Sequence, residues 1–262
     1  MSELALEAVS KSFGGVAAVT EVSLAVPAGR IFALIGPNGA GKTTLFNLIS
    51  GVYRPSAGRV LFADRDVTAA PAHARARLGL ARTFQTPQVF LNMSAVENVM
   101  VGAHRHLDAG LLPALTRLGG FRAAEKYCRA EAAALMEQLG LGRYREEEAG
   151  SLPYGALKRL EVARAMASRP RLLLLDEPAA GLNAGEADEM TGVLRTIAAT
   201  GVTVVLIEHN MRMVMGLAER VLVLVSGRML VEGTPAEVQR HPEVVAAYLG
   251  AEAAPKQERR CA

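Results

Sequence analysis

Tryptophan is absent from the chain, and aromatic residues make up only 5% of its 262 positions. This scarcity argues against a binding surface on which sugars or bases stack. Charge of one sign is not in excess either, because 29 basic and 26 acidic side chains leave a net charge of +3. Nucleic-acid-binding proteins usually gather their basic residues on one face or in a run, whereas here they are dispersed. We therefore expect no nucleic-acid partner.

Long hydrophobic runs are also missing, although 50% of the residues are apolar and the mean hydropathy is +0.20. The longest stretch without a charged residue or histidine, residues 83–96, is interrupted by polar side chains. A membrane-spanning helix needs roughly 18 or more apolar residues in succession. Residues 1–3 also lack the basic and then apolar pattern of a signal peptide. The sequence therefore predicts a chain that is soluble on its own and buries a large core.

Cysteine is scarce, and its two copies, Cys128 and Cys261, lie far apart. Their spacing fits neither a disulfide framework nor a metal site. We expect two free thiols in a reducing compartment.

The hydrophobic pattern changes from strands to helices and back again. Alternating or continuously apolar segments predict strands at residues 4–9, 22–26, 31–35, 171–175, 202–207 and 221–225. Helical periodicity predicts helices at residues 42–50, 95–103, 121–139, 155–168, 185–199 and 242–249, with a loop at 110–120. This order indicates an α/β protein with a helical block in its middle.

The strongest motif follows the predicted strand at 31–35 and opens the next helix. It consists of Gly36, Pro37, Asn38, Gly39, Ala40, Gly41, Lys42, Thr43 and Thr44. This context identifies a phosphate-binding loop, in which glycines let backbone N–H groups surround phosphate oxygens at a helix N-terminus. Lys42 is suited to the β- and γ-phosphates, and the Thr43 hydroxyl is suited to Mg²⁺.

A second motif is an apolar run of four leucines that ends in Asp176 and Glu177. Asp176 then stands at a strand tip, where its carboxylate can meet the Mg²⁺ shell. Glu177, one residue on, points elsewhere and can polarise a water for in-line attack. Paired with the phosphate loop, the two carboxylates predict a nucleotide-hydrolysis site.

Three weaker signals follow a fixed order around these motifs. Gln85 lies between the strand block and the helical block, and His209 closes a later apolar strand. Before the Asp-Glu strand, a helix is introduced by Leu152, Pro153, Tyr154, Gly155 and Ala156.

Taken in order, these motifs resemble the ATP-binding subunits of ABC transporters, and the resemblance covers the chain to about residue 250. It implies that ATP and Mg²⁺ are bound, with Gln85 in the loop that senses the metal and the membrane partner. It further implies that His209 contacts the γ-phosphate and that Phe13 stacks on adenine, although a core role for Phe13 is equally open. Residues 152–156 occupy the signature position, which faces the nucleotide of a second ATPase subunit.

The resemblance also implies a fold and a division of the chain. The expected fold is a P-loop NTPase core with a mixed or parallel sheet, an N-terminal antiparallel β subdomain and an inserted α-helical signature subdomain. Residues 1–86 and 170–250 would form the RecA-like ATP-binding core, and residues 87–169 the helical subdomain. Residues 251–262 would form a flexible tail.

Two positions depart from the pattern of this family. The usual signature is Leu-Ser-Gly-Gly-Gln, but Pro153 brings neither a hydroxyl nor an N–H. Asn183 stands where aspartate is common, in the loop that crosses between two ATPase subunits. Two identical chains are therefore expected to form a weaker ATP sandwich than a heterodimer would.

Finer cues resemble the ATPases of high-affinity branched-chain amino-acid importers. They include the segments at residues 82–85, 152–155, 178–183, 207–211 and 233–250. The implied partners are a second ATPase subunit, two transmembrane permeases and, indirectly, an extracytoplasmic solute-binding protein. The implied location is the cytoplasmic face of the membrane.

Other functions stay open at this point. Importers of urea or short amides and exporters of lipid or lipopolysaccharide use the same type of ATPase. A soluble ABC-type ATPase of DNA repair or translation would need a coiled-coil insertion, a second cassette or a basic arm. A phosphate-loop kinase would need an acceptor pocket and usually lacks the signature, Asp-Glu and histidine series.

Overall fold

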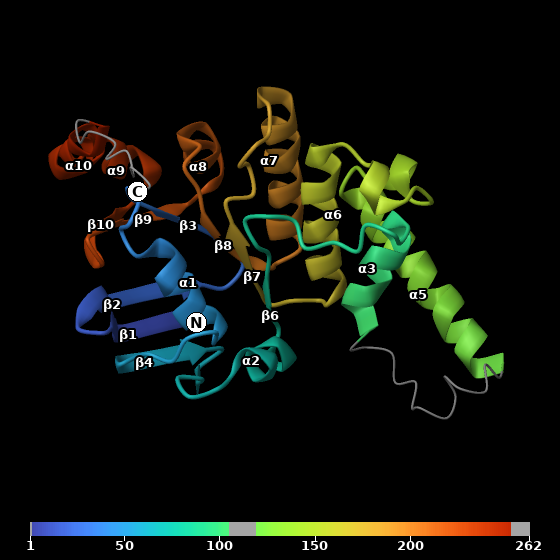
Figure 1. Cartoon of the computed structure of the whole chain (residues 1–262), viewed down its shortest axis with the longest axis horizontal. Helices are drawn as coiled ribbons and strands as arrows, with labels where there is room; N and C mark the ends of the chain where they lie inside the picture. Colours follow the sequence, from blue (N-terminus) through green and yellow to red (C-terminus); the bar gives the residue numbers. More distant parts are fainter. Residues whose placement is uncertain (1, 105–118, 253–262) are drawn as a thin grey trace, which may run out of the picture.

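The computed structural model describes residues 2–104 and 119–252, which form two sheets and the helices around them (Figure 1). Most of the predicted loop at 110–120 and of the predicted tail at 251–262, including Cys261, lies outside the described residues. The other cysteine, Cys128, is buried as a free thiol. The α/β class predicted from the sequence is confirmed.

The larger sheet has six strands, and the phosphate loop follows one of its central strands. Its spatial order is β10 (Arg228–Gly233), β9 (Arg220–Val225), β3 (Ile31–Ile35), β8 (Thr203–Ile207), β7 (Leu172–Asp176) and β6 (Leu80–Arg82). All neighbours pair in parallel except β10, which is antiparallel to β9. The sheet is therefore mixed, as predicted, and β3 matches its predicted bounds.

Alternate residues of the central strands enter two separate hydrophobic cores. On β3, Ile31, Ala33 and Ile35 belong to a core that is shared with helices α3 (Ala95–Ala103), α6 (Tyr154–Ala167), α7 (Ala184–Ala199) and α8 (Met211–Leu217). Phe32 and Leu34 belong to a second core, which is shared with helix α1 (Lys42–Ser50) and the smaller sheet. Burial on both faces explains why these strands read as continuously apolar runs.

The smaller sheet is antiparallel and has the order β2 (Val16–Pro27), β1 (Ser2–Phe13), β4 (Ala57–Phe62) and β5 (Arg65–Asp66). β1 and β2 are each 12 residues long and exceed the predicted segments at 4–9 and 22–26. The register shifts after Leu6, and Ala8 and Glu21 have positive φ values of 47° and 50°. Such bulges interrupt the two-residue alternation, so the sequence pattern ended before the strands did.

The described residues form helices that flank the six-stranded sheet or gather beyond its end. They are α1 (Lys42–Ser50), α2 (Ala72–Leu78), α3 (Ala95–Ala103), α5 (Gly119–Gln138), α6 (Tyr154–Ala167), α7 (Ala184–Ala199), α8 (Met211–Leu217), α9 (Pro235–Arg240) and α10 (Pro242–Glu252), with short 3₁₀ turns at Gly142–Tyr144 and Ala149–Ser151. The six predicted helices are all present, while α2, α8 and α9 were missed because six or seven residues carry too little periodicity. Within the described ranges, no helix is both long and apolar enough to cross a membrane.

Helices α3, α5 and α6 gather at one end of the molecule, and α7 lies between α6 and α8 (Figure 1). The strand β6 leads into the segment that crosses from the sheets to this helical end. Because β3, β6, β7 and β8 run parallel to one another, the residues that follow these strands lie along the same edge of the sheet.

Candidate functional site

The carboxyl ends of β3, β7 and β8 meet at a cleft of about 570 Å³. It is lined by Val16, Ala17, Ala18, Asn38, Gly39, Ala40, Gly41, Lys42, Thr43, Thr44, Glu177, His209, Ser226 and Gly227. Ligand sites in open α/β sheets form at this edge, beyond the strand ends. The structure thus brings the predicted phosphate loop together with Glu177 and His209.

The phosphate loop rests against the neighbouring backbone at two glycines. At Gly36 (φ 150°) an added Cβ would lie 2.1 Å from the carbonyl oxygen of Leu224, and at Gly41 (φ 96°) it would lie 2.4 Å from that of Ala18. Only glycine allows this approach. Lys42 is 7% exposed, and its Nζ donates to the carbonyl oxygens of Gly36 at 2.7 Å and Pro37 at 3.0 Å. Burial lowers the pKa of Lys42, and the charges of Glu177 and Asp176 partly offset this effect.

Glu177 is held by two of the predicted site residues. The Gln85 amide donates to Glu177 Oε2 at 2.8 Å, and His209 Nε2 lies 3.1 Å from Glu177 Oε1. The Glu177 side chain is 21% exposed, so water reaches it. Its carboxylate therefore faces the cleft in a defined orientation.

The backbone around Glu177 is held by a buried carboxylate that the sequence did not mark. Glu208 is 2% exposed and accepts hydrogen bonds from the backbone N–H groups of Ala179 (2.6 Å), His209 and Asn210 (2.9 Å each). Glu208 thereby joins the loop after β7 to the loop after β8. Glu177 itself has a φ of 50°, in the left-handed region that non-glycine residues rarely adopt.

Asp176 forms a buried ion pair with Arg82. Arg82 Nη2 lies 3.0 Å from Asp176 Oδ2, and the two side chains are 8% and 9% exposed. Arg82 also donates to Asn47 Oδ1 at 2.6 Å and Ser50 Oγ at 3.0 Å on α1. Burial raises the pKa of Asp176, and the Arg82 guanidinium counteracts that rise. Sequence reasoning missed this contact, because Arg82 and Asp176 lie 94 positions apart in the chain.

The side chains predicted to hold Mg²⁺ carry the oxygen atoms that this ion prefers, and of the three only Thr43 lines the cleft itself. The Thr43 hydroxyl, the Gln85 amide and the Asp176 carboxylate all belong to segments at this edge of the sheet. Among residues 2–104 and 119–252, no group of three His, Cys, Asp or Glu side chains could hold a metal. Mg²⁺ suits such a site, because it is usually held by one or two protein groups together with substrate phosphates and waters.

The predicted signature residues lie away from this cleft. Leu152 to Ala156 lead into α6, with Pro153 at the N-cap and no side chain capping the helix. Tyr154 is 43% exposed. An added Cβ at Gly155 would lie 2.7 Å from Glu186, so the start of α6 packs closely on α7. None of the five residues lines the cleft of their own chain.

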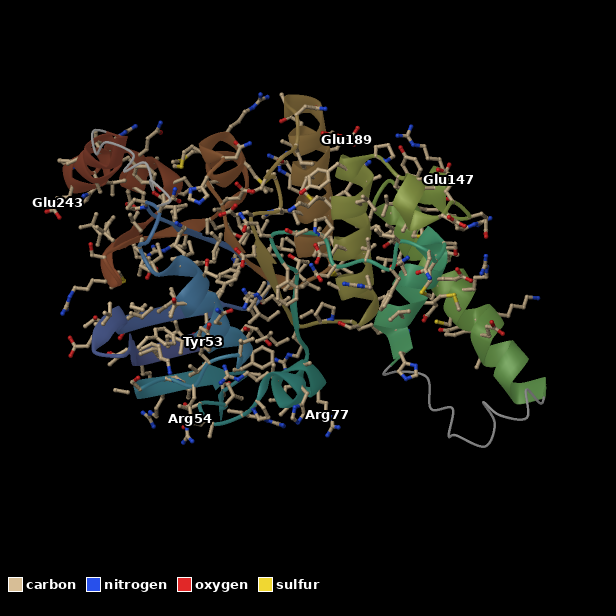
Figure 2. The ribbon with its side chains drawn as sticks, viewed as in Figure 1. Tyr53, Arg54, Arg77, Glu147, Glu189 and Glu243 are labelled. Atoms are coloured by element: carbon tan, nitrogen blue, oxygen red, sulfur yellow. The ribbon has the colours of Figure 1, made fainter. Side chains whose placement is uncertain are left out.

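Two other predicted residues have local partners. Asn183 caps α7, with its Oδ1 accepting from the Glu186 N–H at 3.0 Å. Phe13 does not line the cleft, whereas Val16 does. The Phe13 ring packs edge-on against Tyr53 at 5.2 Å, with Lys11 Nζ 5.1 Å from the Phe13 ring centre; Tyr53 is labelled in Figure 2. The role of Phe13 toward adenine stays a prediction.

Comparison with protein families gives two matches within the chain. The family model described as ABC transporter matches residues 19–180. A second family model, described as branched-chain amino acid ATP-binding cassette transporter, matches residues 228–254.

Curated relatives align over nearly the whole chain. The high-affinity branched-chain amino acid transport ATP-binding protein BraF of Pseudomonas aeruginosa is 41% identical over 248 residues, which cover 94% of this chain and 97% of the relative. LivG of Escherichia coli K12, which carries the same description, is 41% identical over 250 residues, with the same shares covered. The lipopolysaccharide export system ATP-binding protein LptB of Acidithiobacillus ferridurans is 38% identical over 252 residues, covering 95% and 98%.

Solved structures of similar chains have the same fold. A nucleotide-free ATP-binding cassette from an ABC transporter has a TM-score of 0.82 and 31% identity, covering 95% of this chain and 99% of its own. A cassette in its ADP conformation has a TM-score of 0.82 and 32% identity over the same shares.

Proposed function

Because the chain belongs to the ABC transporter ATP-binding family, we propose that it binds and hydrolyses ATP to power the import of branched-chain amino acids through partner permeases. The observation that carries this proposal is the Glu177 carboxylate, which Gln85 and His209 hold at the phosphate-loop cleft. It is the arrangement that nucleotide hydrolysis needs, with a phosphate cradle on one side and an oriented carboxylate on the other.

The residues divide the chemistry among them. The N–H groups of residues 36–44 and the Lys42 ammonium bind the phosphates, and Glu177 orients and deprotonates the attacking water. His209 stabilises charge on the transferring phosphoryl group, and Gln85 holds Glu177. Thr43, Asp176 and Gln85 would hold Mg²⁺, which neutralises phosphate charge when bound. Since phosphoryl transfer depends mostly on positioning and electrostatics, few other groups are required.

The importer assignment is supported at the C-terminal end. The branched-chain amino acid family model matches residues 228–254, and the branched-chain transport relatives BraF and LivG are 41% identical. The lipopolysaccharide export relative is 38% identical over a similar length. The identity to the importer relatives exceeds the identity to the exporter relative by only a few per cent. The match of the branched-chain family model to residues 228–254 is what favours import.

The proposed assembly contains a second ATPase subunit, two permeases and, indirectly, a solute-binding protein. ATP would lie between the phosphate loop of one subunit and residues 152–156 of the other, so its γ-phosphate would join the two surfaces. The absence of signature residues from the cleft of their own chain supports this arrangement. The chain would then lie on the cytoplasmic face of the membrane as a peripheral subunit.

The proposed division of the chain places the core at residues 1–86 and 170–250 and the helical subdomain at 87–169. It is supported by the position of α3, α5 and α6 together at one end of the molecule (Figure 1). Helix α6 is the one that carries the proposed signature at its start.

Solute uptake in cells tests the proposed function. A strain lacking this gene is complemented with the wild-type chain or with Lys42→Ala, and uptake of radiolabelled leucine, isoleucine and valine is measured. We expect wild type to restore uptake and Lys42→Ala to leave it at the level of the deletion strain. Unchanged branched-chain uptake in the deletion strain, with a defect in amide uptake or in the cell envelope, would contradict the importer assignment.

A further inference from the structure

Lys158 is a buried cation that lies among carboxylates of the proposed active site. It lies on α6 and is 2% exposed. Four carboxylates act on its charge, namely Glu161, Glu208, Glu177 and Asp176. Burial lowers the pKa of Lys158, and these four charges oppose the shift. A buried ammonium group is costly unless it is paired and hydrogen-bonded, so its partners are informative.

The Lys158 ammonium bonds the backbone of two proposed site residues. Its Nζ donates to the carbonyl oxygen of Gln85 at 2.5 Å and to that of Glu177 at 3.2 Å. The side chains of these same two residues hydrogen-bond to each other at 2.8 Å. Lys158 therefore fixes the backbone on both sides of the hydrogen bond that orients the proposed catalytic carboxylate.

Glu177 needs such an external contact because its backbone is strained. A φ of 50° is unfavourable at a non-glycine residue and persists only when the surrounding structure holds it. Glu177 N–H donates to the carbonyl oxygen of Ile207 at 3.0 Å. The Glu177 carbonyl oxygen accepts from the Ala180 N–H at 3.1 Å and from Lys158 Nζ at 3.2 Å. The Lys158 contact is the one that comes from α6.

A second buried residue of α6 contacts the same segment. Glu161 is 3% exposed, and its Oε1 accepts from the N–H groups of Phe84 at 3.2 Å and Gln88 at 3.3 Å. Lys158 donates to the carbonyl oxygen of Gln85, which lies between Phe84 and Gln88 in the chain. Helix α6 therefore holds this segment both by accepting from its N–H groups and by donating to its carbonyl oxygen. A shift of α6 therefore has to move the Gln85 segment.

The start of α6 is connected to Lys158 through Tyr154. Lys158 Nζ lies 5.9 Å from the centre of the Tyr154 ring, within the range of a cation–π contact. Tyr154 is 43% exposed and belongs to the segment that would face a second subunit. A partner that contacts this exposed ring would therefore be connected to the Glu177 backbone through a single residue, Lys158.

We propose that Lys158 is a positioning residue that couples the position of α6 to the orientation of Glu177. The inference rests on the proposed ATPase function. Within the described part of the chain, the hydrogen bonds of Lys158 Nζ go to two backbone carbonyl oxygens, and Lys158 does not line the cleft. It therefore acts through Gln85 and Glu177 and not on the nucleotide.

Arg159, the next residue of α6, provides a matched control. It is also buried, at 9% exposure, and it also carries a positive charge. Its Nη1 lies 2.6 Å from Oε2 of Glu189 on α7, labelled in Figure 2. It therefore joins α6 to α7, and among the described residues no hydrogen bond or ion pair links it to Gln85 or Glu177.

The test compares Lys158→Met, Lys158→Arg and Arg159→Met in the full-length chain. For Lys158→Met we expect kcat for ATP hydrolysis to fall by at least about tenfold while the nucleotide Kd stays within about twofold. Hydrogen exchange of the backbone amides at residues 84–88 should become faster. Lys158→Arg should recover part of kcat, because it restores the positive charge. Arg159→Met should lower the melting temperature yet keep kcat within about threefold.

The proposal is overturned if Lys158→Met retains kcat, or if both methionine variants reduce kcat equally. Should Lys158→Met fail to fold, Lys158→Gln keeps a polar side chain and is judged by the same measurements. A wild-type chain that binds ATP without hydrolysing it, even when it is assembled with its proposed partner ATPase subunit and permeases, would overturn the proposed function instead. Unchanged hydrogen exchange at residues 84–88 in Lys158→Met would overturn the Lys158 contact independently of activity.

Discussion

Individual side chains of the site are held mainly by buried charges. Arg82 pairs with Asp176 at 3.0 Å, Lys158 holds the carbonyl of Gln85, and Glu208 accepts three backbone hydrogen bonds. Each of these groups is costly to bury alone, but each is paired with an opposite charge or hydrogen-bonded to backbone. The site around Glu177, the proposed catalytic carboxylate, thus depends on residues that do not line the cleft.

The ion pair between Arg82 and Asp176 gives a stability prediction. Arg82→Met leaves the buried Asp176 carboxylate without its partner, and removing one member of a buried pair typically costs about 3–5 kcal/mol. Urea denaturation should show a loss of this size. The double variant Arg82→Met/Asp176→Asn should be less destabilised, because the orphaned charge is gone. Equal destabilisation of the single and double variants would show that the pair is not the cause.

At the scale of elements, the site is built from loops that rigid strands hold against each other. The phosphate loop touches β9 at Gly36 and β2 at Gly41. The turn after β9 also contributes, since the Gly227 N–H donates to the carbonyl oxygen of Ala40 at 2.9 Å. The loop is therefore fixed from outside as well as by its own sequence.

Gly36→Ala tests the contact between the loop and β9. Its new Cβ would lie 2.1 Å from the Leu224 carbonyl oxygen, so the loop must move. We expect the Kd for ATP to rise at least about tenfold, equivalent to ~1.4 kcal/mol, in a fluorescent-nucleotide titration. Gly192→Ala on α7, where a Cβ would meet nothing within 4 Å, is the control and should bind ATP normally. Normal binding by Gly36→Ala would mean that this contact does not shape the loop.

The N-terminus of α3 gives a prediction that depends on pH. Ser94 and Glu97 form a capping box, and hydrogen bonds from Ser94 lower the pKa of Glu97 below its ordinary value of 4.5. A carboxylate with a lowered folded-state pKa adds stability above its unfolded pKa and loses it as the pH falls through the folded pKa. Ser94→Ala should therefore cost about 1 kcal/mol at neutral pH and less in acid. Urea denaturation across this range measures the difference, and a cost that does not change with pH would contradict the assignment.

For the molecule as a whole, the features that could be predicted from the sequence are those carried by short contiguous motifs. The phosphate loop, Asp176, Glu177 and His209 each follow an apolar strand, and parallel strands bring such ends together. Arg82 and Asp176 lie 94 positions apart, and Lys158 and Gln85 lie 73 apart, so no local pattern could reveal their contacts. The strands β1 and β2 were predicted too short, because bulges at Ala8 and Glu21 break their alternation.

The signature segment, in which Pro153 replaces the serine that is usual in the family, gives a prediction about assembly. Pro153 offers no hydroxyl or N–H to a γ-phosphate across an interface, so ATP should join two copies of this chain only weakly. In size-exclusion chromatography with ATP, Glu177→Gln should remain largely monomeric. Adding Pro153→Ser should increase the dimer fraction. A tight ATP-dependent homodimer of Glu177→Gln alone would contradict this prediction.

The central claim is that Glu177, held at the phosphate-loop cleft, drives ATP hydrolysis. The most direct test measures ATP binding and phosphate release for the wild-type chain and Glu177→Gln side by side, at a protein concentration at which wild type turns over. The account predicts an unchanged nucleotide Kd and a loss of turnover of at least about a hundredfold. Near-normal hydrolysis by Glu177→Gln would contradict it.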